Sequence, residues 1–226
     1  MDTFIKVNQG SEIIHINKTI LTTKPKRMLY KRNRLFFDEF VDYTHNSLGY
    51  RTYENIPKNY GLAVGCSHTY GQGLKVEERW STLVEESSGV DIINLGTCGT
   101  GINFILLNLL RLITSNVESP KFIIMQCPSE QRLTLPKLDS TTNVVPQHSR
   151  FASLYKDDSI ECHSRECYDL IHKLCKKEKI KIIDFYFWNS SIEKSKQVEV
   201  LDFARDMDHP GIKTQHLVKE YVMSKL

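Results

Sequence analysis

The sequence lacks the features that mark a membrane protein, a small disulfide-bonded domain or a nucleic-acid-binding chain. Its longest leucine-rich run, residues 102–112, contains Asn103 and Asn108 and is too short to span a membrane. Six cysteines scattered over 226 residues form no small-domain disulfide framework, and no spacing of Cys and His matches a strong zinc site. The net charge of +3 is small, and basic residues are interspersed with acidic ones, so nothing favours nucleic acid as a partner.

The composition is that of an ordinary globular protein, with 40% hydrophobic and 25% charged residues. The length fits one domain with an appendage. Residues 1–58 are predicted to be an irregular N-terminal extension, packed on or preceding the core, with short strands at 4–7 and 12–16. Residues 59–226 are predicted to be the main domain. The N-terminus lacks the pattern of a signal peptide, so we expect a cytoplasmic or phage-associated protein.

From residue 59 onwards, short apolar runs alternate with segments of helical periodicity. Buried strands are predicted at residues 62–64, 90–95, 122–125 and 180–188. Helices are predicted at residues 77–87, 102–114, 162–177 and 212–223, whereas residues 128–158 show no clear period. The alternation predicts an α/β fold with a parallel sheet covered by helices on both faces. The loops that follow the strands should then meet at one edge of the sheet, where ligands bind.

A serine follows the first predicted strand, in residues 65–73, which read Gly-Cys-Ser-His-Thr-Tyr-Gly-Gln-Gly. A nucleophilic serine needs an exposed position at the mouth of a sheet, with main-chain N–H groups nearby to hold an oxyanion. The segment lacks both the Gly-x-Ser-x-Gly elbow of α/β-hydrolases and the lysine of a phosphate-binding loop. Ser67 is therefore a candidate nucleophile, and the alternative is a plain turn or a helix N-cap.

Glycines follow the second predicted strand, in residues 94–101, which read Asn-Leu-Gly-Thr-Cys-Gly-Thr-Gly. Glycine lets the main chain approach a ligand closely. Gly96, Gly99 and Gly101 echo a dinucleotide-binding fingerprint, but the spacing is wrong and no acidic residue ends the next strand. The loop is a candidate for ligand contact, and the alternative is a tight turn from strand to helix.

Asp206 and His209 lie three residues apart near the C-terminus, directly before Pro210. In a single turn, that spacing lets the carboxylate reach Nδ1 of the imidazole and leaves Nε2 free to take a proton from a serine. Pro210 suits the start of the closing helix. The alternative is that Asp206 caps this helix and His209 lies on the surface. Because Ser67, Gly99 and His209 are all expected at one edge of the sheet, we favour a shared site.

These residues resemble the blocks of the SGNH hydrolase superfamily, which includes the GDSL esterases, over the last three quarters of the chain. The resemblance implies a flavodoxin-like, three-layer α/β/α fold. It implies that Ser67 is the nucleophile, with Cys66 in place of the usual aspartate of Gly-Asp-Ser. It also implies that Asp206 and His209 form the Asp-x-x-His pair and that the N–H groups of Ser67 and Gly99 hold the oxyanion. No metal or cofactor is implied.

The third block of the family differs in this chain. It usually reads Gly-x-Asn-Asp after the third strand, and its asparagine donates to the oxyanion. Residues 125–132 here read Met-Gln-Cys-Pro-Ser-Glu-Gln-Arg, without an asparagine. Glu130 is nearest by position, whereas Gln131 or Ser129 could donate where an ionised carboxylate cannot. We expect either a rebuilt oxyanion hole or a weak or inactive enzyme.

Three polar residues are candidates for contacts with the substrate. His68 follows Ser67 directly, while Arg132 and Arg150 belong to the long polar segment after the third strand. Long loops of this kind often serve as lids or binding segments. The alternative is a solvated excursion without a role in binding.

The leading hypothesis is a serine esterase that hydrolyses a small acyl ester through an acyl-enzyme. An O-acetyl group on a carbohydrate is the expected substrate, by analogy with the family alone. One alternative is a non-catalytic binding or structural module on the same fold, in a phage particle or in surface-polysaccharide machinery. The missing asparagine favours that alternative. Another is an O-acyltransferase that passes the acyl group to a second hydroxyl.

Overall fold

The computed structural model of the chain describes Phe4 and residues 26–30, 39–136, 141–144, 158–188 and 195–226. Apart from Phe4, the strands predicted at residues 4–7 and 12–16 lie outside the described residues, as does Arg150. Phe4 is buried, and its ring lies edge-on to that of Tyr50 at 6.4 Å between centroids.

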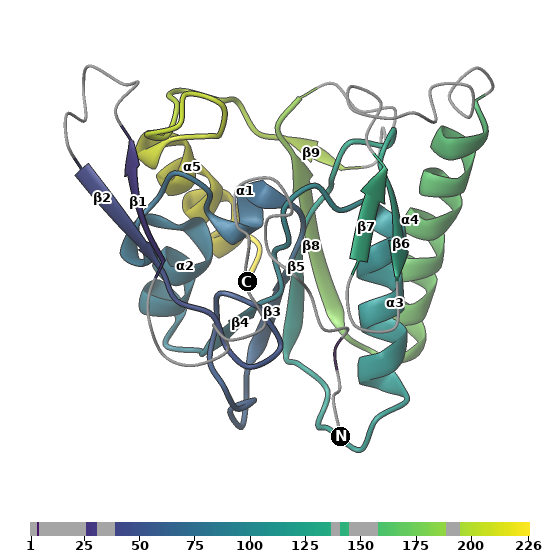
Figure 1. Cartoon of the computed structure of the whole chain (residues 1–226). Coiled ribbons are helices and arrows are strands. Elements are labelled where there is room, and N and C mark those ends of the chain that lie inside the picture. The colour runs from purple at the N-terminus through teal and green to yellow at the C-terminus, as the bar shows by residue number, and fades with distance from the viewer. Residues whose placement is uncertain (1–3, 5–25, 31–38, 137–140, 145–157, 189–194) are drawn as a thin grey trace.

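Five parallel strands form the central sheet (Figure 1). In spatial order they are β4 (Ile92–Asn94), β3 (Gly61–Val64), β5 (Phe122–Gln126), β8 (Lys181–Tyr186) and β9 (Lys196–Gln197). Numbered along the chain, this order is second, first, third, fourth, fifth, which is the flavodoxin order. Strands β3, β4 and β5 are buried along their whole length, as expected for a sheet covered on both faces. The predicted three-layer, flavodoxin-like fold is confirmed.

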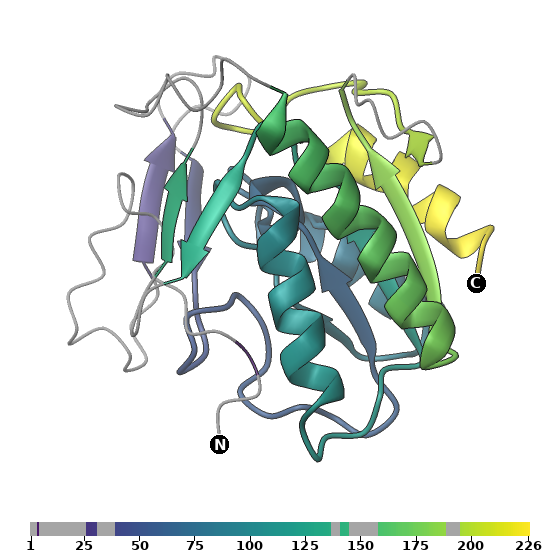
Figure 2. The same ribbon diagram turned by 90° about the vertical axis from the view of Figure 1, so that its right-hand side faces the viewer.

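Helices cover both faces of the sheet. Figure 2 shows α3 (Ile102–Ile113) and α4 (Ser159–Lys177) lying side by side on one face. On the other face, α2 (Trp80–Ser88) packs against α5 (Ile212–Met223). Each pair buries its apolar side chains against the strands, which produces two hydrophobic clusters, one on each face. In the described part of the chain, no helix is long and apolar enough to cross a lipid bilayer.

The predicted helices are all present, with small differences at their ends. The closing helix occupies residues 212–223, as predicted. The helix predicted at 77–87 begins only at Trp80, because a 3-10 turn occupies Val76–Glu78. The helix predicted at 162–177 begins three residues earlier, at Ser159. Boundary shifts of this size are common, because apolar periodicity marks the middle of a helix better than its ends.

Two antiparallel hairpins lie in regions where the sequence shows no period. One pairs β1 (Lys26–Tyr30) with β2 (Glu39–Tyr43), within the extension predicted to be irregular. The other pairs β6 (Leu133–Pro136) with β7 (Thr141–Val144), after β5. Strands of four or five residues leave too few alternations for a clear signal, so sequence analysis missed both.

The chain just before β3 packs tightly against the main domain. Tyr50 is 0% exposed, and its hydroxyl accepts a hydrogen bond from Nδ2 of Asn108 in α3 at 3.1 Å. The buried guanidinium of Arg51 donates to the carbonyl oxygens of Gly71 and Leu74, both at 3.0 Å. These residues of the predicted extension therefore contribute to the core and support the segment that follows β3.

Replacing Tyr50 by Ala should destabilise the protein by about 3–5 kcal/mol, because it empties a fully buried aromatic position. Tyr50→Phe keeps the ring and should lose only about 1 kcal/mol, the net contribution of a typical hydrogen bond. Urea denaturation measures both losses, and Lys58→Ala at an exposed position is the control. If Tyr50→Ala were as stable as this control, the segment before β3 would not belong to the folded core.

Candidate active site

Ser67 is the first residue of α1 (Ser67–Tyr70), a four-residue helix that directly follows β3. Cys66 occupies the N-cap position, and the helix ends at Gly71, whose φ of 77° is in the left-handed region that glycine adopts readily. All four helix residues are buried, and Ser67 is 5% exposed. The predicted nucleophile therefore lies at the carboxyl end of an inner strand, next to the point where the strand order reverses.

Asp206 and His209 lie between β9 and α5, in a turn closed by main-chain hydrogen bonds. The N–H of Ala204 donates to the carbonyl oxygen of His209 at 2.7 Å, and the N–H of Met207 donates to that of Ala204 at 2.9 Å. Oδ1 of Asp206 accepts the N–H groups of Asp208 and His209, both at 3.1 Å. One carboxylate oxygen thus shapes the turn and leaves Oδ2 for the imidazole.

The imidazole of His209 connects Asp206 to Ser67. Its Nδ1 lies 2.7 Å from Oδ2 of Asp206, and its Nε2 lies 2.8 Å from Oγ of Ser67. Burial alone would raise the pKa of Asp206, but the hydrogen bonds and charge of His209 lower it below the ordinary value. An ionised carboxylate only accepts, so Nδ1 carries the proton and Nε2 accepts from the Ser67 hydroxyl. These two hydrogen bonds allow a proton to pass from Ser67 to His209, as a nucleophilic serine requires.

A buried ion pair holds the turn of Asp206 in place. The side chain of Arg205 is 2% exposed, and its guanidinium donates to both carboxylate oxygens of Glu78, at 2.6 and 2.8 Å. Nη1 of Arg205 also donates to the carbonyl oxygen of Gly73 at 3.3 Å. The pair therefore connects the turn of Asp206 to the segment that directly follows α1, and α1 is the helix that contains Ser67. Sequence analysis missed it, because its two members are 127 residues apart and neither forms part of a motif.

The loop after β4 packs directly on α1. A side chain at Gly96 would clash with the main-chain nitrogen of Tyr70, so glycine permits this close approach. The Asn94 side chain accepts the N–H of Gly96 at 2.9 Å and donates to a main-chain oxygen of α1 at 2.8 Å. The main-chain N–H groups of Ser67 and Gly99 have no acceptor among the described residues. Two free donors on adjoining loops are what a developing oxyanion requires.

The three alternatives for a third oxyanion donor follow β5, and among the described residues none of their side chains forms a hydrogen bond with Ser67. The exposed amide of Gln131 donates to Glu161 at 3.1 Å. Glu130 forms an ion pair with Arg165 at 3.6 Å. Ser129 is exposed. The structure therefore directs these side chains towards α4 and solvent rather than towards the nucleophile.

Cys66, which stands where the SGNH family has aspartate, contacts the end of β5. Its thiol donates to Oε1 of Gln126 at 3.1 Å, and its N–H donates to the same oxygen at 3.3 Å. Gln126 is buried and is the last residue of β5. This side chain, for which the sequence suggested no role, therefore fixes the loop of the nucleophile to the neighbouring strand.

Aromatic rings lie beside the imidazole of His209. The ring of His68 is 5.3 Å from that of His209 and 4.7 Å from that of Trp188. Burial lowers the pKa of His68 well below its ordinary value, and the charges of His209 and Arg132 lower it further, so His68 is neutral at pH 7. Trp188 is 47% exposed and offers part of its indole to solvent. Its position at the end of a predicted strand gave no sign of a role at the site.

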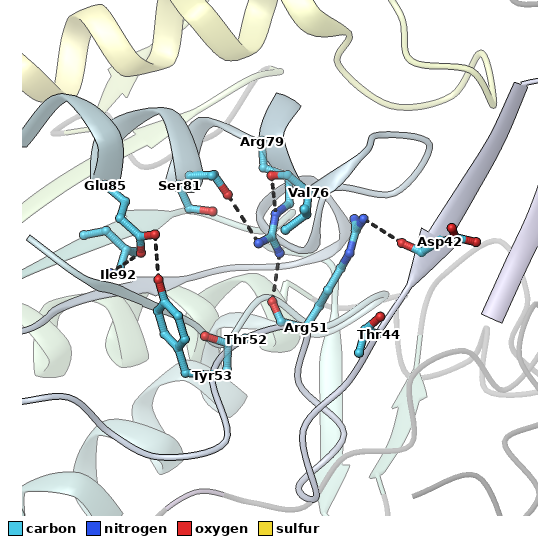
Figure 3. Close-up of a pocket in the computed structure, with 11 residues that line it drawn as sticks. Asp42, Thr44, Arg51, Thr52, Tyr53, Val76, Arg79, Ser81, Glu85 and Ile92 are labelled. Carbon is cyan, nitrogen blue, oxygen red and sulfur yellow. Dashed lines mark hydrogen bonds between the residues drawn. The ribbon is translucent and has the colours of Figure 1, made fainter. Parts of the chain in front are cut away.

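A separate cavity of about 380 Å³ lies between β2, α2 and the segment before β3 (Figure 3). Its polar lining is dominated by two buried arginines whose guanidinium groups donate to main-chain oxygens. Arg51 donates to the carbonyl of Asp42 at 3.1 Å, and Arg79 donates to that of Arg51 at 2.9 Å. Burial and the nearby Arg51 lower the pKa of Arg79 to about 9. None of the residues that form the Ser67–His209–Asp206 chain lines this cavity.

Comparison with known proteins supports the fold. Neither a protein-family model nor a curated protein matches the sequence. An acetyl xylan esterase from the rumen bacterium Butyrivibrio proteoclasticus is similar over 76% of this chain and 65% of that protein, with 14% identity and a TM-score of 0.50. The protein TesA is similar over 74% and 97%, with 15% identity and a TM-score of 0.49. A member of the lipolytic G-D-S-L family from Veillonella parvula DSM 2008 is similar over 73% and 96%, with 14% identity and a TM-score of 0.39.

The chain thus shares its fold with this acetyl xylan esterase, and the three-layer α/β/α fold that the resemblance implied is confirmed. At such low identities, shared architecture does not establish shared chemistry, because one fold supports many functions. The function has to be argued from the side chains around Ser67.

Replacing His68 by Gln should flatten the pH dependence of stability in acid. In the unfolded chain, His68 takes up a proton near its ordinary pKa of about 6.5, whereas the native state resists protonation because the side chain is buried. As the pH falls through that value, the unfolded state gains a proton and the wild type loses stability, until the pH reaches the lowered pKa of the folded state.

The free energy of unfolding in urea, compared between about pH 7.5 and about pH 5, measures this effect. His216→Gln is the matched control, because His216 is exposed, and it should keep the wild-type slope. An equal loss of stability in the wild type and in His68→Gln would mean that His68 is not held neutral.

Proposed function

We propose that this protein is a carboxylic ester hydrolase in which Ser67, His209 and Asp206 are the catalytic residues. The observation that carries the proposal is the chain of two hydrogen bonds, 2.7 Å from Asp206 to His209 and 2.8 Å from His209 to Ser67. If Asp206 only capped a helix and His209 only lay on the surface, there would be no reason for the imidazole to bridge the carboxylate and the Ser67 hydroxyl. The N–H groups of Ser67 and Gly99, which have no acceptor among the described residues, add the donors that acyl transfer needs.

The reaction proceeds through an acyl-enzyme. Oγ of Ser67 attacks the ester carbonyl carbon while Nε2 of His209 takes its proton, and Asp206 stabilises the imidazolium that forms. The carbonyl oxygen becomes an oxyanion held by the N–H groups of Ser67 and Gly99. The intermediate then collapses, and the imidazolium gives its proton to the leaving alcohol. Water, deprotonated by His209, attacks the acyl-serine and releases the carboxylic acid with Ser67 restored. The scheme needs no metal or cofactor.

The surroundings of Ser67 support a small acyl group on a carbohydrate. Ser67 is only 5% exposed, which favours a short acyl chain such as acetyl. Sugar rings stack their C–H faces on exposed aromatic rings. Trp188 offers such a surface next to His68, whose ring in turn contacts that of His209, the residue that gives its proton to the leaving alcohol. The acetyl xylan esterase that shares the fold adds support by analogy alone.

Ser67→Ala should abolish hydrolysis of para-nitrophenyl acetate, with a loss of roughly 10⁶-fold in kcat, and Asp206→Asn should lose roughly 10⁴-fold. A fluorophosphonate probe followed by mass spectrometry should place the label on Ser67 of the wild type. The exposed Ser224→Ala is the control and should keep full activity and labelling. A wild type that neither turns over nor takes up the label would refute the esterase and favour a binding module on the same fold.

Trp188→Ala should raise KM for acetylated xylo-oligosaccharides by roughly ten-fold, because the sugar loses the apolar surface that it buries on the indole, at about 25 cal/mol per Å². It should leave KM for para-nitrophenyl acetate nearly unchanged, since that ester carries no sugar. Trp188→Phe should restore most of the affinity for the sugar ester. Equal effects of Trp188→Ala on both substrates would argue against a carbohydrate platform. Added sugar acceptors that become acylated would indicate an acyltransferase.

A further inference from the structure

We propose that the guanidinium of Arg132 is the third hydrogen-bond donor to the oxyanion formed at Ser67. The proposal rests on the esterase function proposed above. Arg132 would take the place of the third donor for which Gln131, Ser129 and Glu130 were the alternatives. In this structure Gln131 and Glu130 bind residues of α4, and Ser129 is exposed.

The segment that carries Arg132 is fastened to the loop of Gly99. A side chain at Gly101 would clash with the carbonyl oxygen of Arg132, so the two main chains are in direct contact. The N–H of Gly101 donates to Oγ1 of Thr134 at 2.9 Å, and the Asn103 side chain exchanges two hydrogen bonds with the main chain of Thr134, at 2.7 and 3.1 Å. Arg132 therefore starts from a rigid position close to the loop that supplies an oxyanion donor.

One nitrogen of the Arg132 guanidinium, Nη1, is buried and lacks a hydrogen-bond acceptor among the described residues. Two buried arginines near this site are satisfied instead: Arg205 pairs with Glu78, and Arg51 donates to several carbonyl oxygens. A buried donor without an acceptor is costly, and more so when it is charged. Such a group is expected where a ligand supplies the acceptor.

The charge of Arg132 acts on both residues that flank the proposed oxyanion donors. It is among the causes that lower the pKa of His68, after burial and His209. It also opposes the rise that burial causes in the pKa of Cys98. His68 follows Ser67 and Cys98 precedes Gly99. The charge of Arg132 therefore acts on residues next to both N–H groups, and the main chain of Arg132 contacts the Gly99 loop at Gly101.

In the reaction, Arg132 donates a charge-assisted hydrogen bond to the ester carbonyl oxygen as that oxygen becomes negative. No proton is transferred, because Arg132 only donates a hydrogen bond and its N–H bond stays intact. The bond is stronger than one from a neutral amide, since the donor is ionised. Arg132 thus stabilises the tetrahedral intermediates of both the acylation and the deacylation steps.

The test compares Arg132→Gln and Arg132→Lys with the wild type on para-nitrophenyl acetate, which is uncharged. Losing one oxyanion donor should lower kcat by roughly 10²- to 10³-fold and leave KM nearly unchanged. Arg132→Lys should retain more activity than Arg132→Gln, because it keeps a cationic donor. Arg111→Gln, at an exposed position of α3, is the matched control and should keep the wild-type kcat.

Thermal stability separates a catalytic role from a structural one. Arg132→Gln should have a Tm equal to or above that of the wild type, because the substitution removes a charged group whose buried Nη1 has no partner among the described residues. A lower Tm together with the lost activity would instead mean that Arg132 supports the loop, and would overturn the proposal.

Two further outcomes would also overturn it. Arg132→Gln with wild-type kcat on para-nitrophenyl acetate, in an enzyme whose Ser67 is labelled, would refute Arg132 as an oxyanion donor and leave the esterase intact. Normal activity on the neutral acetate but a raised KM for mono-para-nitrophenyl succinate would show that Arg132 binds an anionic part of the substrate. A wild type without turnover or label would be the failure of the esterase itself.

Discussion

Because all five strands of the central sheet run parallel, their carboxyl ends lie at the same edge, and a crossover must connect each strand to the next. The loops after β3, β4 and β9 therefore meet, although Ser67 and His209 are 142 residues apart in the chain. Topology brings these loops together within a few ångströms. The turn of Asp206 and the packing of Gly96 on α1 then set the final geometry.

The buried charges around this edge are each held in a different way. Asp206 is stabilised as a carboxylate by three donors, which keeps His209 in the orientation that faces Ser67. Arg205 has a bidentate partner in Glu78 and fixes the turn. In Arg132, one buried nitrogen has no partner among the described residues. Buried charges that have partners hold their side chains in fixed positions. A buried donor without a partner marks a place where a bound ligand supplies the acceptor.

Much of the site could be read from local patterns. A serine after a short apolar run, glycines after the next run, and Asp-x-x-His before a proline are all contiguous in the chain. The partners that support them are not. Gln126 binds Cys66 from the next strand of the sheet, and Trp188 reaches His68 from the end of β8. Such contacts have no sequence signature, because they join side chains whose only relation is their place in the folded protein.

The sequence by itself determined the alternation of strands and helices, the parallel α/β class of the fold and the candidate residues Ser67, Gly99, Asp206 and His209. It could do so because apolar periodicity and short-range spacing are properties of neighbouring residues. Only the tertiary structure decided that Gln131 and Glu130 bind residues of α4, while Arg132 keeps a buried nitrogen without a partner among the described residues. The direction of a side chain depends on packing and on partners far along the chain, and neither is written in the residues beside it.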